Sequence, residues 1–213
     1  MKIILIGASG QLGREIIKSS PNNIKLLTPS KKELNLGDPE VCYKYTLANK
    51  PDWVINSGAY TNVEKAEHNK EIALIINAKG PESIAKALSN TGGKLLHIST
   101  DYVFDGNQNI PYKTTQDICP INFYGFSKAK GEEYIQNLLT DFNQLCIIRT
   151  SWLMGAKGNN FANKMIQLIN SRDEIKVVYD QISSPTITSS LANAIWKMIE
   201  INNLYTSDNK IFP

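Results

Sequence analysis

Short apolar runs separated by longer amphipathic stretches mark residues 1–150 of this chain. Five runs rich in β-branched side chains stand out: Ile3–Ile6, Ile24–Leu27, Trp53–Asn56, Leu95–Ile98 and Cys146–Ile148. Runs that are apolar at every position indicate strands covered on both faces, and their alternation with helices indicates parallel pairing through right-handed crossovers. The pattern therefore predicts an α/β chain with a Rossmann-type doubly wound parallel sheet. Such sheets bind ligands at the carboxyl ends of their strands.

The stretches between the runs show helical periodicity. Gln11–Ser19 and Glu71–Asn90 both repeat apolar residues at helical spacing. Pro81 interrupts the second stretch, so we expect a kink or a break there, and Gly92-Gly93 is a typical helix stop. Further helices are predicted from Tyr124 to Leu138 and over Leu191–Ile199. The segment 101–122 has no periodicity, and a loop of that length is usually functional or mobile.

The composition is that of an ordinary globular protein and narrows the function classes. The 213 residues carry a net charge of +3, without the basic stripe that nucleic acid requires. Three widely separated cysteines argue against a disulfide framework and for a reducing compartment. The apolar start of the chain ends at Gly7, far short of a signal peptide core or a membrane span. We therefore expect a soluble, cytoplasmic protein that binds neither nucleic acid nor membranes.

A glycine-rich loop follows the first predicted strand and opens the first predicted helix. It has the pattern G-x-x-G-x-x-G over Gly7–Gly13, in the place that a dinucleotide-binding fingerprint requires. Gly7 permits a turn with positive φ, Gly10 lets the backbone approach a pyrophosphate, and Gly13 lets the helix pack closely on the strand. The free amides at the helix start would then face the phosphates. The alternative is a plain glycine-rich turn.

The end of the second predicted strand bears on the choice of nicotinamide cofactor. An NAD enzyme typically has an acidic residue there for the ribose 2′-hydroxyl. This chain has Thr28-Pro29-Ser30-Lys31-Lys32, with no carboxylate before Glu33. A 2′-phosphate would be favoured by Ser30 and a lysine, so we expect NADPH. NADH is the alternative if the lysines are simply solvated.

Tyr124 and Lys128 form a Y-x-x-x-K pair near the start of a predicted helix. Their spacing places the phenol and the ammonium on one face, one turn apart. Reduction of a carbonyl by hydride requires a proton, and a nearby cation lowers the pKa of a phenol, which makes it a better acid. Lys128 can also reach the ribose hydroxyls of a bound nucleotide. The pair is expected to carry out proton transfer.

The fourth predicted strand ends at Thr100, where a substrate carbonyl would lie beside the nicotinamide. Its hydroxyl can donate a hydrogen bond to the oxygen as negative charge builds there. Ser99 is disfavoured as a hydrolase nucleophile, because it lacks the G-x-S-x-G elbow and no histidine follows residue 97. His68 and His97 have no metal-ligand spacing and are expected to be ordinary surface and strand-end residues.

Further phrases flank these motifs along the chain. They are Gly10-Gln11-Leu12-Gly13, Ala59-Tyr60-Thr61, Ser99-Thr100-Asp101-Tyr102-Val103-Phe104, Arg149-Thr150-Ser151-Trp152, Gly158-Asn159-Asn160-Phe161, Asp180-Gln181 and Pro185-Thr186. Together they resemble the dTDP-4-dehydrorhamnose reductase family of the extended short-chain dehydrogenase/reductase superfamily. The resemblance implies NADPH-dependent reduction of the C4 keto group of dTDP-4-dehydro-L-rhamnose to dTDP-L-rhamnose.

The resemblance also implies residue roles. Thr100, Tyr124 and Lys128 would be catalytic, with Tyr124 as the proton donor. The residues expected to bind the cofactor are Gly7, Gly10, Gln11, Leu12, Gly13, Ser30, Asn35, Leu36, Ala59, Tyr60, Thr61 and Lys128. Those expected to bind the substrate are Thr61, Thr100, Tyr124 and Trp152. Asn35 stands where the family usually has Asp, which changes the charge near the adenine.

Several alternatives stay open at this point. A regulatory subunit resembling that of methionine adenosyltransferase would bind the nucleotide without catalysis, and a sister epimerase or reductase would act on another nucleotide sugar. A dehydratase is disfavoured, because no Asp-Glu pair follows Thr100. Family members run on beyond this length, so we expect residues 1–150 to form the NAD(P)-binding domain and 151–213 an incomplete substrate lobe interleaved with the end of the sheet. A homodimer and an Mg²⁺ ion at its interface, with Glu15 as a candidate ligand, rest on the resemblance alone.

Overall fold

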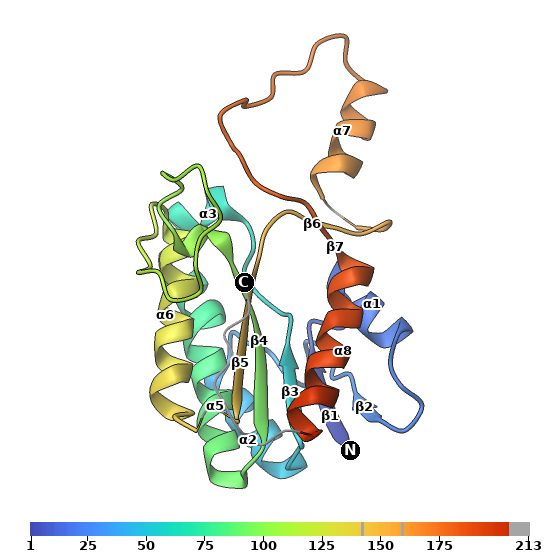
Figure 1. The fold of residues 1–213 in the computed structure, drawn as a ribbon, viewed down its shortest axis with the longest axis vertical. Coiled ribbons are helices and arrows are strands. Elements are labelled where there is room, and N and C mark those ends of the chain that lie inside the picture. Colours follow the sequence, from blue (N-terminus) through green and yellow to red (C-terminus); the bar gives the residue numbers. More distant parts are fainter. Residues whose placement is uncertain (142, 159, 205–213) are drawn as a thin grey trace.

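A parallel sheet of five strands forms the centre of the molecule (Figure 1). The computed structural model describes residues 1–141, 143–158 and 160–204. The strands are β1 (Lys2–Ile6), β2 (Lys25–Leu27), β3 (Trp53–Asn56), β4 (Lys94–Thr100) and β5 (Leu145–Thr150), in the order β2-β1-β3-β4-β5. All four pairings are parallel. The predicted doubly wound sheet is confirmed, and each predicted run overlaps one strand.

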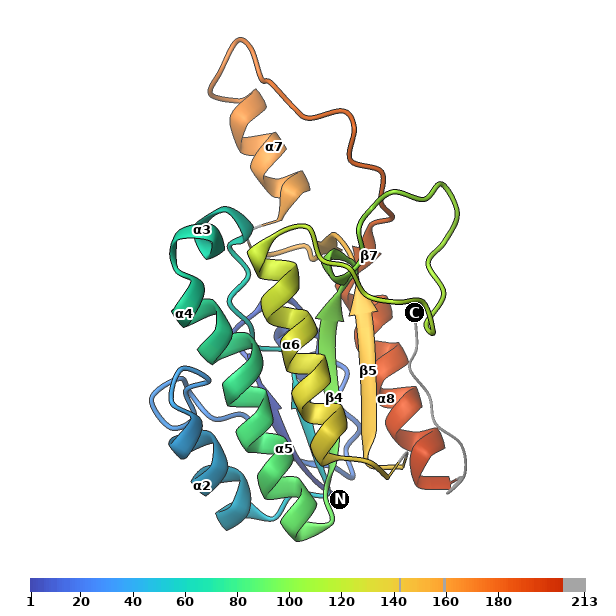
Figure 2. The ribbon, with the colours of Figure 1, turned by 90° about the vertical axis from the view of Figure 1, so that its left-hand side faces the viewer.

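Helices cover both faces of this sheet (Figure 2). The helices α1 (Gln11–Lys18) and α8 (Thr188–Leu204) pack on one face, and α2 (Pro39–Asn49), α5 (Gly80–Thr91) and α6 (Phe123–Leu138) pack on the other. Successive strand residues point to opposite faces. In β1, Ile3 and Leu5 therefore join the core under α1 and α8, while Ile4 and Ile6 join the core under α2 and α5. This double coverage explains why the strand runs are apolar at every position.

The stretch around Pro81 is helical throughout, with a widened turn in its middle. A short helix, α4 (Lys70–Leu74), leads into a π-helical turn, η1 (Ile75–Lys79), which leads into α5. Pro81 lies in the first turn of α5, where a missing backbone amide costs little. The predicted interruption is thus a π-turn before the proline. The helix ends at Gly92, whose φ of +75° is the expected left-handed stop.

The periodicity did not predict α2, α3 (Val63–His68) or α7 (Phe161–Ile169). Of the α2 side chains only Cys42 and Thr46 are buried, so the helix has almost no apolar stripe. A short 3₁₀ turn, η2 (Asp101–Val103), follows β4, and a second small sheet pairs β6 (Leu153–Met154) with β7 (Thr186–Ile187). The α7 segment extends away from the carboxyl edge of the main sheet (Figure 1).

The last described helix, α8, returns to the first strands of the main sheet. It packs against α1, and the indole nitrogen of Trp196 donates to the carbonyl oxygen of Ile16 at 3.1 Å. Residues 188–204 therefore complete the face of the sheet that α1 begins. Within the described part of the chain, no helix combines the length and the apolar character needed to cross a membrane.

Candidate functional site

A cavity of about 730 Å³ lies at the carboxyl ends of β1, β2 and β3. This size is typical of small-molecule and cofactor sites. Ten of the twelve predicted cofactor residues line it: Gly7, Gly10, Gln11, Leu12, Gly13, Ser30, Asn35, Leu36, Ala59 and Thr61. The other two, Tyr60 and Lys128, are not among its lining residues. Most of the residues that the sequence suggested for cofactor binding therefore surround one cavity, but Tyr60 and Lys128 do not line it.

The glycine loop takes the shape that its motif requires. Gly7 has a φ of +83°, and a Cβ there would lie 2.7 Å from the amide nitrogen of Gly58. A Cβ on Gly13 would lie 2.2 Å from the carbonyl oxygen of Gly7, so α1 begins in direct contact with the loop. Gly10 donates its amide to the same oxygen at 2.9 Å. This arrangement brings the amino end of α1 to the cavity, which suits a phosphate group.

The side chain of Gln11 joins the glycine loop to the segment after β6. Its Oε1 accepts hydrogen bonds from the amide of Gly155 at 3.2 Å and from Nδ2 of Asn160 at 2.8 Å. A Cβ on Gly158 would lie 2.7 Å from Cγ of Gln11. Gln11, expected to contact the pyrophosphate, is thus also a structural link between the start of α1 and the segment after β6.

The carboxylate of Glu33, the first after the second strand, folds back onto Ser30. The amide and the hydroxyl of Ser30 both donate to Oε2 of Glu33, at 2.8 and 2.7 Å. These hydrogen bonds, the backbone one most strongly, hold the pKa of Glu33 below its usual value. Sequence reasoning missed this contact, in which the Glu33 side chain folds back over a turn to accept both donors of Ser30. Lys31 lines the cavity next to it.

Thr100 and Tyr124, two of the residues expected to be catalytic, meet at the carboxyl end of β4. Thr100 is the last residue of the strand, and a hydrogen bond joins its side chain to that of Tyr124 on α6. The Thr100 hydroxyl also lies 3.1 Å from Oδ1 of Asp101, to which it donates, and it accepts from the amide of Tyr102 at 3.2 Å. The ring of Tyr102 packs edge-on against Tyr124, with the ring centroids 5.7 Å apart.

The expected lowering of the Tyr124 pKa by Lys128 is wrong for this structure. The pKa of the phenol is raised to about 12, mainly by burial; the hydrogen bond to Thr100 opposes this rise, and the neighbouring Asp101 and Tyr102 add to it. Lys128 is not among the groups that shift the pKa of Tyr124. Its amine contacts His97 and the carbonyl oxygen of Ile98 instead. Tyr124 therefore stays protonated at neutral pH.

Lys128 is directed into the protein interior rather than to the cavity. Only 1% of its surface is exposed, and its Nζ donates to the carbonyl oxygen of Ile98 at 2.7 Å. It also lies 3.1 Å from Nε2 of His97, which is fully buried. Burial lowers the pKa of Lys128 to about 8, although Glu132 raises it. The interpretation of His97 as an ordinary strand-end residue is thus wrong, since it is the partner of the predicted catalytic lysine.

Asn77, in the π-helical turn, holds the predicted cofactor residue Tyr60 by its backbone. Its Oδ1 accepts from the amide of Tyr60 at 2.8 Å, and its Nδ2 donates to the Tyr60 carbonyl at 3.0 Å and to the Ser127 hydroxyl at 2.9 Å. Asn77 therefore connects the loop after β3 to the helix that carries Tyr124. Sequence reasoning missed it, although an asparagine within an apolar helical stretch can indicate a buried side chain that binds a neighbouring backbone segment.

An ion pair lies under the strand end that carries Thr100. Glu132, one turn after Lys128 on α6, is fully buried and faces Arg149 on β5, with Nη2 2.7 Å from Oε2. Glu132 also accepts a hydrogen bond from the hydroxyl of Ser99. Arg149 reaches the carbonyl oxygen of Thr114 at 3.3 Å. The pair thus joins β4, β5 and α6 to the loop 104–119.

Trp152 lies just after β5 with a φ of +40°, a strained conformation for a residue with a large side chain. Its ring centroid lies 5.4 Å from that of Phe161 on α7. Neither residue belongs to the core clusters, and 44% of Phe161 is exposed. Both rings therefore lie outside the described core clusters.

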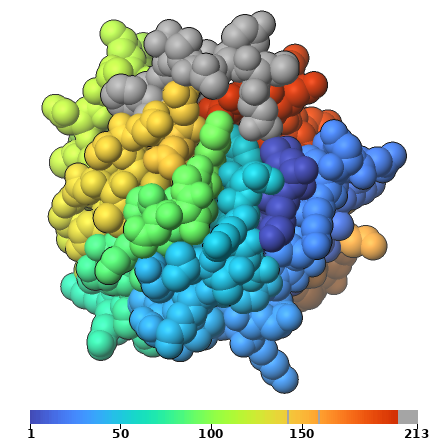
Figure 3. Space-filling model, turned by 90° about the horizontal axis from the view of Figure 1, so that it is seen from below, coloured from blue at the N-terminus to red at the C-terminus, as the bar shows by residue number. Residues whose placement is uncertain are grey.

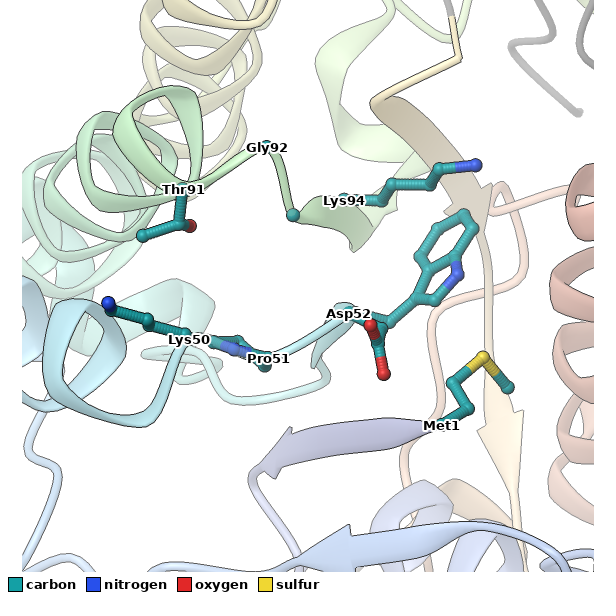
Figure 4. A pocket seen from close by; sticks show the side chains of 9 residues that line it. Met1, Lys50, Pro51, Asp52, Thr91, Gly92 and Lys94 are labelled. Carbon is teal, nitrogen blue, oxygen red and sulfur yellow. The ribbon is translucent and has the colours of Figure 1, made fainter.

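A second cavity, of about 560 Å³, lies at the opposite, amino-terminal edge of the sheet (Figure 4). Lys50, Asp52 and Lys94 line it, and it contains none of the predicted site residues. The view from below shows the starts of β1, β3 and β4 side by side at this end (Figure 3). Among the residues with described placement, no three His, Cys, Asp or Glu side chains converge as a metal site would require.

Sequence comparison identifies the relatives of this chain. The family model of the RmlD substrate binding domain matches residues 1–212. The dTDP-4-dehydrorhamnose reductase of Burkholderia thailandensis is 38% identical over 193 residues, which cover 91% of this chain and 64% of that protein. The enzyme of the same name from Escherichia coli K12 is 37% identical over 205 residues, covering 94% and 68%. The chain thus spans about two thirds of the length of these relatives.

Solved structures agree with the sequence relatives. A dTDP-4-dehydrorhamnose reductase from Clostridium acetobutylicum superimposes with a TM-score of 0.89 and 39% identity, covering 95% of this chain and 71% of that one. The Bacillus anthracis enzyme in complex with NADP gives a TM-score of 0.86 and 39% identity, covering 93% and 70%. The fold, the family model and the relatives all confirm the family that the sequence motifs indicated. The chain belongs to the dTDP-4-dehydrorhamnose reductase family.

Proposed function

We propose that this chain takes part in the NADPH-dependent reduction of the C4 keto group of dTDP-4-dehydro-L-rhamnose, with Tyr124 as the proton donor. The observation that carries the proposal is the contact between Tyr124 and Thr100 at the carboxyl end of β4. That edge of the sheet also holds the nucleotide cavity. The activity of the relatives, which are longer than this chain, supports the choice of substrate.

The cavity fits a nicotinamide nucleotide in its shape and its donors. The glycine loop and the start of α1 would hold the pyrophosphate, Asn35 and Leu36 would lie near the adenine, and Ser30 with Lys31 would face a 2′-phosphate. The complex of the Bacillus anthracis relative with NADP supports NADPH over NADH. When bound, the nucleotide supplies the hydride.

Tyr124 is suited to giving a proton rather than taking one. Burial keeps its pKa near 12, so the phenol is protonated throughout the neutral range. Hydride addition to a ketone places negative charge on the carbonyl oxygen, which requires a hydrogen-bond donor and then a proton. Thr100 would orient that oxygen and Tyr124 would protonate it, leaving an alcohol at C4 and a phenolate that regains its proton from solvent.

Of the predicted substrate lobe 151–213, we propose that 151–187 belong to it, whereas 188–204 pack on the main sheet and 205–213 lie outside the described residues. Trp152 and Phe161 offer two aromatic rings outside the core, and such rings can pack against a sugar or a base. The segment 172–185 reaches the catalytic edge, since the hydroxyl of Ser183 donates to Oδ2 of Asp101 at 3.2 Å. These contacts favour a nucleotide-sugar site next to Thr100.

The test follows NADPH oxidation with dTDP-4-dehydro-L-rhamnose and detects the product by mass spectrometry. Tyr124→Phe should reduce kcat by at least about 100-fold, the size of a general-acid contribution, while leaving NADPH binding in place. Tyr134→Phe, on the same helix, is the matched control and should keep its activity. Turnover that persists in Tyr124→Phe would remove Tyr124 from this role. If the unaltered chain binds NADPH without turnover, the regulatory nucleotide-binding alternative is favoured.

A further inference from the structure

A buried chain of polar side chains runs from the catalytic helix to the cofactor loop. Lys128 Nζ lies 3.1 Å from Nε2 of His97, and Nδ1 of His97 lies 3.1 Å from Nδ2 of Asn56. Oδ1 of Asn56 in turn accepts the amide of Gly58 at 3.1 Å. The three side chains are at most 1% exposed, so water does not compete with these contacts.

The direction of each hydrogen bond in this series of side chains follows from its last member, the backbone amide of Gly58. The backbone amide of Gly58 can only donate, so the oxygen of Asn56 faces it and the NH₂ group faces His97. Nδ1 of His97 must therefore accept. A neutral imidazole then carries its proton on Nε2, which points at Lys128. Lys128 has to accept this proton as a neutral amine, while it donates to the carbonyl of Ile98.

Charging Lys128 would reverse these hydrogen bonds. An ammonium group has three donors and no acceptor, so Nε2 of His97 would have to accept and the imidazole proton would move to Nδ1. Asn56 would then have to turn its oxygen towards His97, which leaves its NH₂ group facing the amide of Gly58. That amide would lose its acceptor. Gly58 packs directly behind Gly7, where a Cβ would lie 2.7 Å from its nitrogen.

We propose that His97 and Asn56 are positioning residues that couple the charge of Lys128 to the backbone of the cofactor loop at Gly58. With Lys128 neutral, the loop has the shape described above; with Lys128 charged, the Gly58 amide is left without its acceptor and the loop has to adjust. Coupling of this kind is reciprocal. Filling the cavity would therefore change the number of protons bound at Lys128. The identity of the loop's ligand rests on the proposed function, but the coupling itself does not.

Both charge states of Lys128 are accessible near neutral pH. Glu132 on the same helix favours the charged form, but it is paired with Arg149 of β5. From β4 the facing group is His97, whose own pKa burial and Lys128 hold well below its usual value. Tyr124 precedes Lys128 by one turn and stays neutral. Burial outweighs Glu132, which leaves the Lys128 pKa at about 8.

The tautomer of His97 tests the coupling directly. The chain has two histidines, so ¹⁵N spectra of the imidazoles contain two sets of signals, and His68→Gln identifies those of the exposed residue. We expect the proton on Nε2 above the Lys128 titration and on Nδ1 below it, with the titration followed by the ¹³Cε signal that Lys128→Met removes. In Lys128→Met the tautomer should not change with pH. A His97 tautomer that stays the same while Lys128 titrates would overturn the proposal.

Asn56→Asp provides a second, independent measurement. A carboxylate can only accept, so it satisfies both Gly58 and a proton on Nδ1 of His97. The titration of Lys128 should then rise by at least about one pH unit, a tenfold change in its proton affinity. In a His97→Gln background the rise should largely disappear. A rise of the same size in both backgrounds would show direct attraction between charges and contradict the coupling. Asn23→Asp, an exposed change of the same charge, should leave the titration unchanged.

Nucleotide binding separates this inference from the proposed function. Titration calorimetry with NADPH in two buffers of different ionisation enthalpy gives the protons taken up or released on binding. The unaltered protein should show a proton change that Lys128→Met removes; binding with no proton change would overturn the coupling. If NADPH fails to bind while the His97 tautomer still follows Lys128, the proposed function fails and the coupling stands.

Discussion

Arg149 and Glu132 face each other in a two-pronged contact, with Nε of the guanidinium 3.2 Å from both carboxylate oxygens and Nη2 2.7 Å from one of them. Glu132 is fully buried, and its remaining hydrogen-bonding capacity is used by Ser99. The guanidinium lies over the ring of Phe104, 5.1 Å from its centroid. The end of strand β4 thus packs against an ion pair that Ser99, Phe104 and the Thr114 carbonyl hold in place.

Removing one member of this pair should be costly. Arg149→Met leaves Glu132 buried without a counter-charge, and we expect a loss of about 3–5 kcal/mol in the free energy of unfolding. Urea unfolding followed by circular dichroism measures it. Lys130→Met is the matched control, because it breaks a partly exposed pair with Glu133 on the same helix and should cost at most about 1 kcal/mol. Equal losses in the two variants would contradict the assigned role of burial.

The glycine loop predicts a sharp contrast between two alanine substitutions. In Gly13→Ala the new Cβ would lie 2.2 Å from the Gly7 carbonyl oxygen, so the loop or α1 must shift. We expect a loss on the order of 3 kcal/mol in stability, as for severe overpacking, together with a loss of NADPH binding. Gly106→Ala meets nothing within 4 Å and should cost only about 1 kcal/mol, from its positive φ. Thermal unfolding and fluorescence titration with NADPH distinguish the two effects.

The carboxylate beside Ser30 should limit the preference for NADPH. Glu33 accepts both donors of Ser30, and its charge would repel a 2′-phosphate at that end of the cavity. In Glu33→Gln the affinity for NADPH should rise several-fold while that for NADH changes little. The two dissociation constants are compared with those of Glu40→Gln, a surface change of the same charge. Weaker NADPH binding in Glu33→Gln would instead mean that Glu33 orders the turn for the phosphate.

The buried lysine should make stability depend on pH in a definite direction. The pKa of Lys128 falls from 10.5 to about 8 on folding, so between these values the unfolded chain binds the extra proton. Its contribution therefore makes the folded protein more stable as the pH rises from about 8 to 10.5, by up to about 3 kcal/mol. Lys128→Met removes this contribution.

The stability difference between Lys128→Met and the unaltered protein isolates the effect. Tyr124, with its pKa raised to about 12, contributes the opposite slope at high pH, but it does so in both proteins. Urea unfolding at pH 7.5 and at pH 10 should show the larger gain from Lys128→Met at pH 7.5. A gain that does not depend on pH would mean that the amine is not titrating in the interior.

The sequence predicted the sheet well because its signal is local. A buried parallel strand is apolar at each position, and Trp53–Asn56 was found at the observed bounds. Helix α2 was not predicted because its sequence has almost no apolar stripe. Helix α7 does have apolar residues at helical spacing, and sequence reasoning missed it. Periodicity shows a helix only when one of its faces is buried and the other is not.

The site was predicted in its residues but not in its hydrogen bonds. The glycine motif and the Y-x-x-x-K spacing identify backbone shape and helix face, which neighbouring residues determine. The partners of Lys128 and Glu132 come from β4 and β5, and only the folded sheet brings His97 and Arg149 to them. The pKa of Tyr124 is raised where the sequence predicted a lowered one. Burial causes the rise, and burial depends on the whole fold.

The π-helical turn at 75–79 makes this part of the chain sensitive to its length. A π-turn accommodates one residue more than a regular helix does, and here Asn77 in that turn holds Tyr60, while a Cβ on Gly131 would lie 2.2 Å from the Asn77 carbonyl oxygen. Deleting one residue there would restore a regular helix in which α4 and α5 keep their faces, but the turn itself would be lost. Asn77 would then no longer hold the backbone of Tyr60 and the hydroxyl of Ser127. In descendants of this gene, single-residue deletions should therefore be tolerated in the loop 104–119 and lost from 75–79.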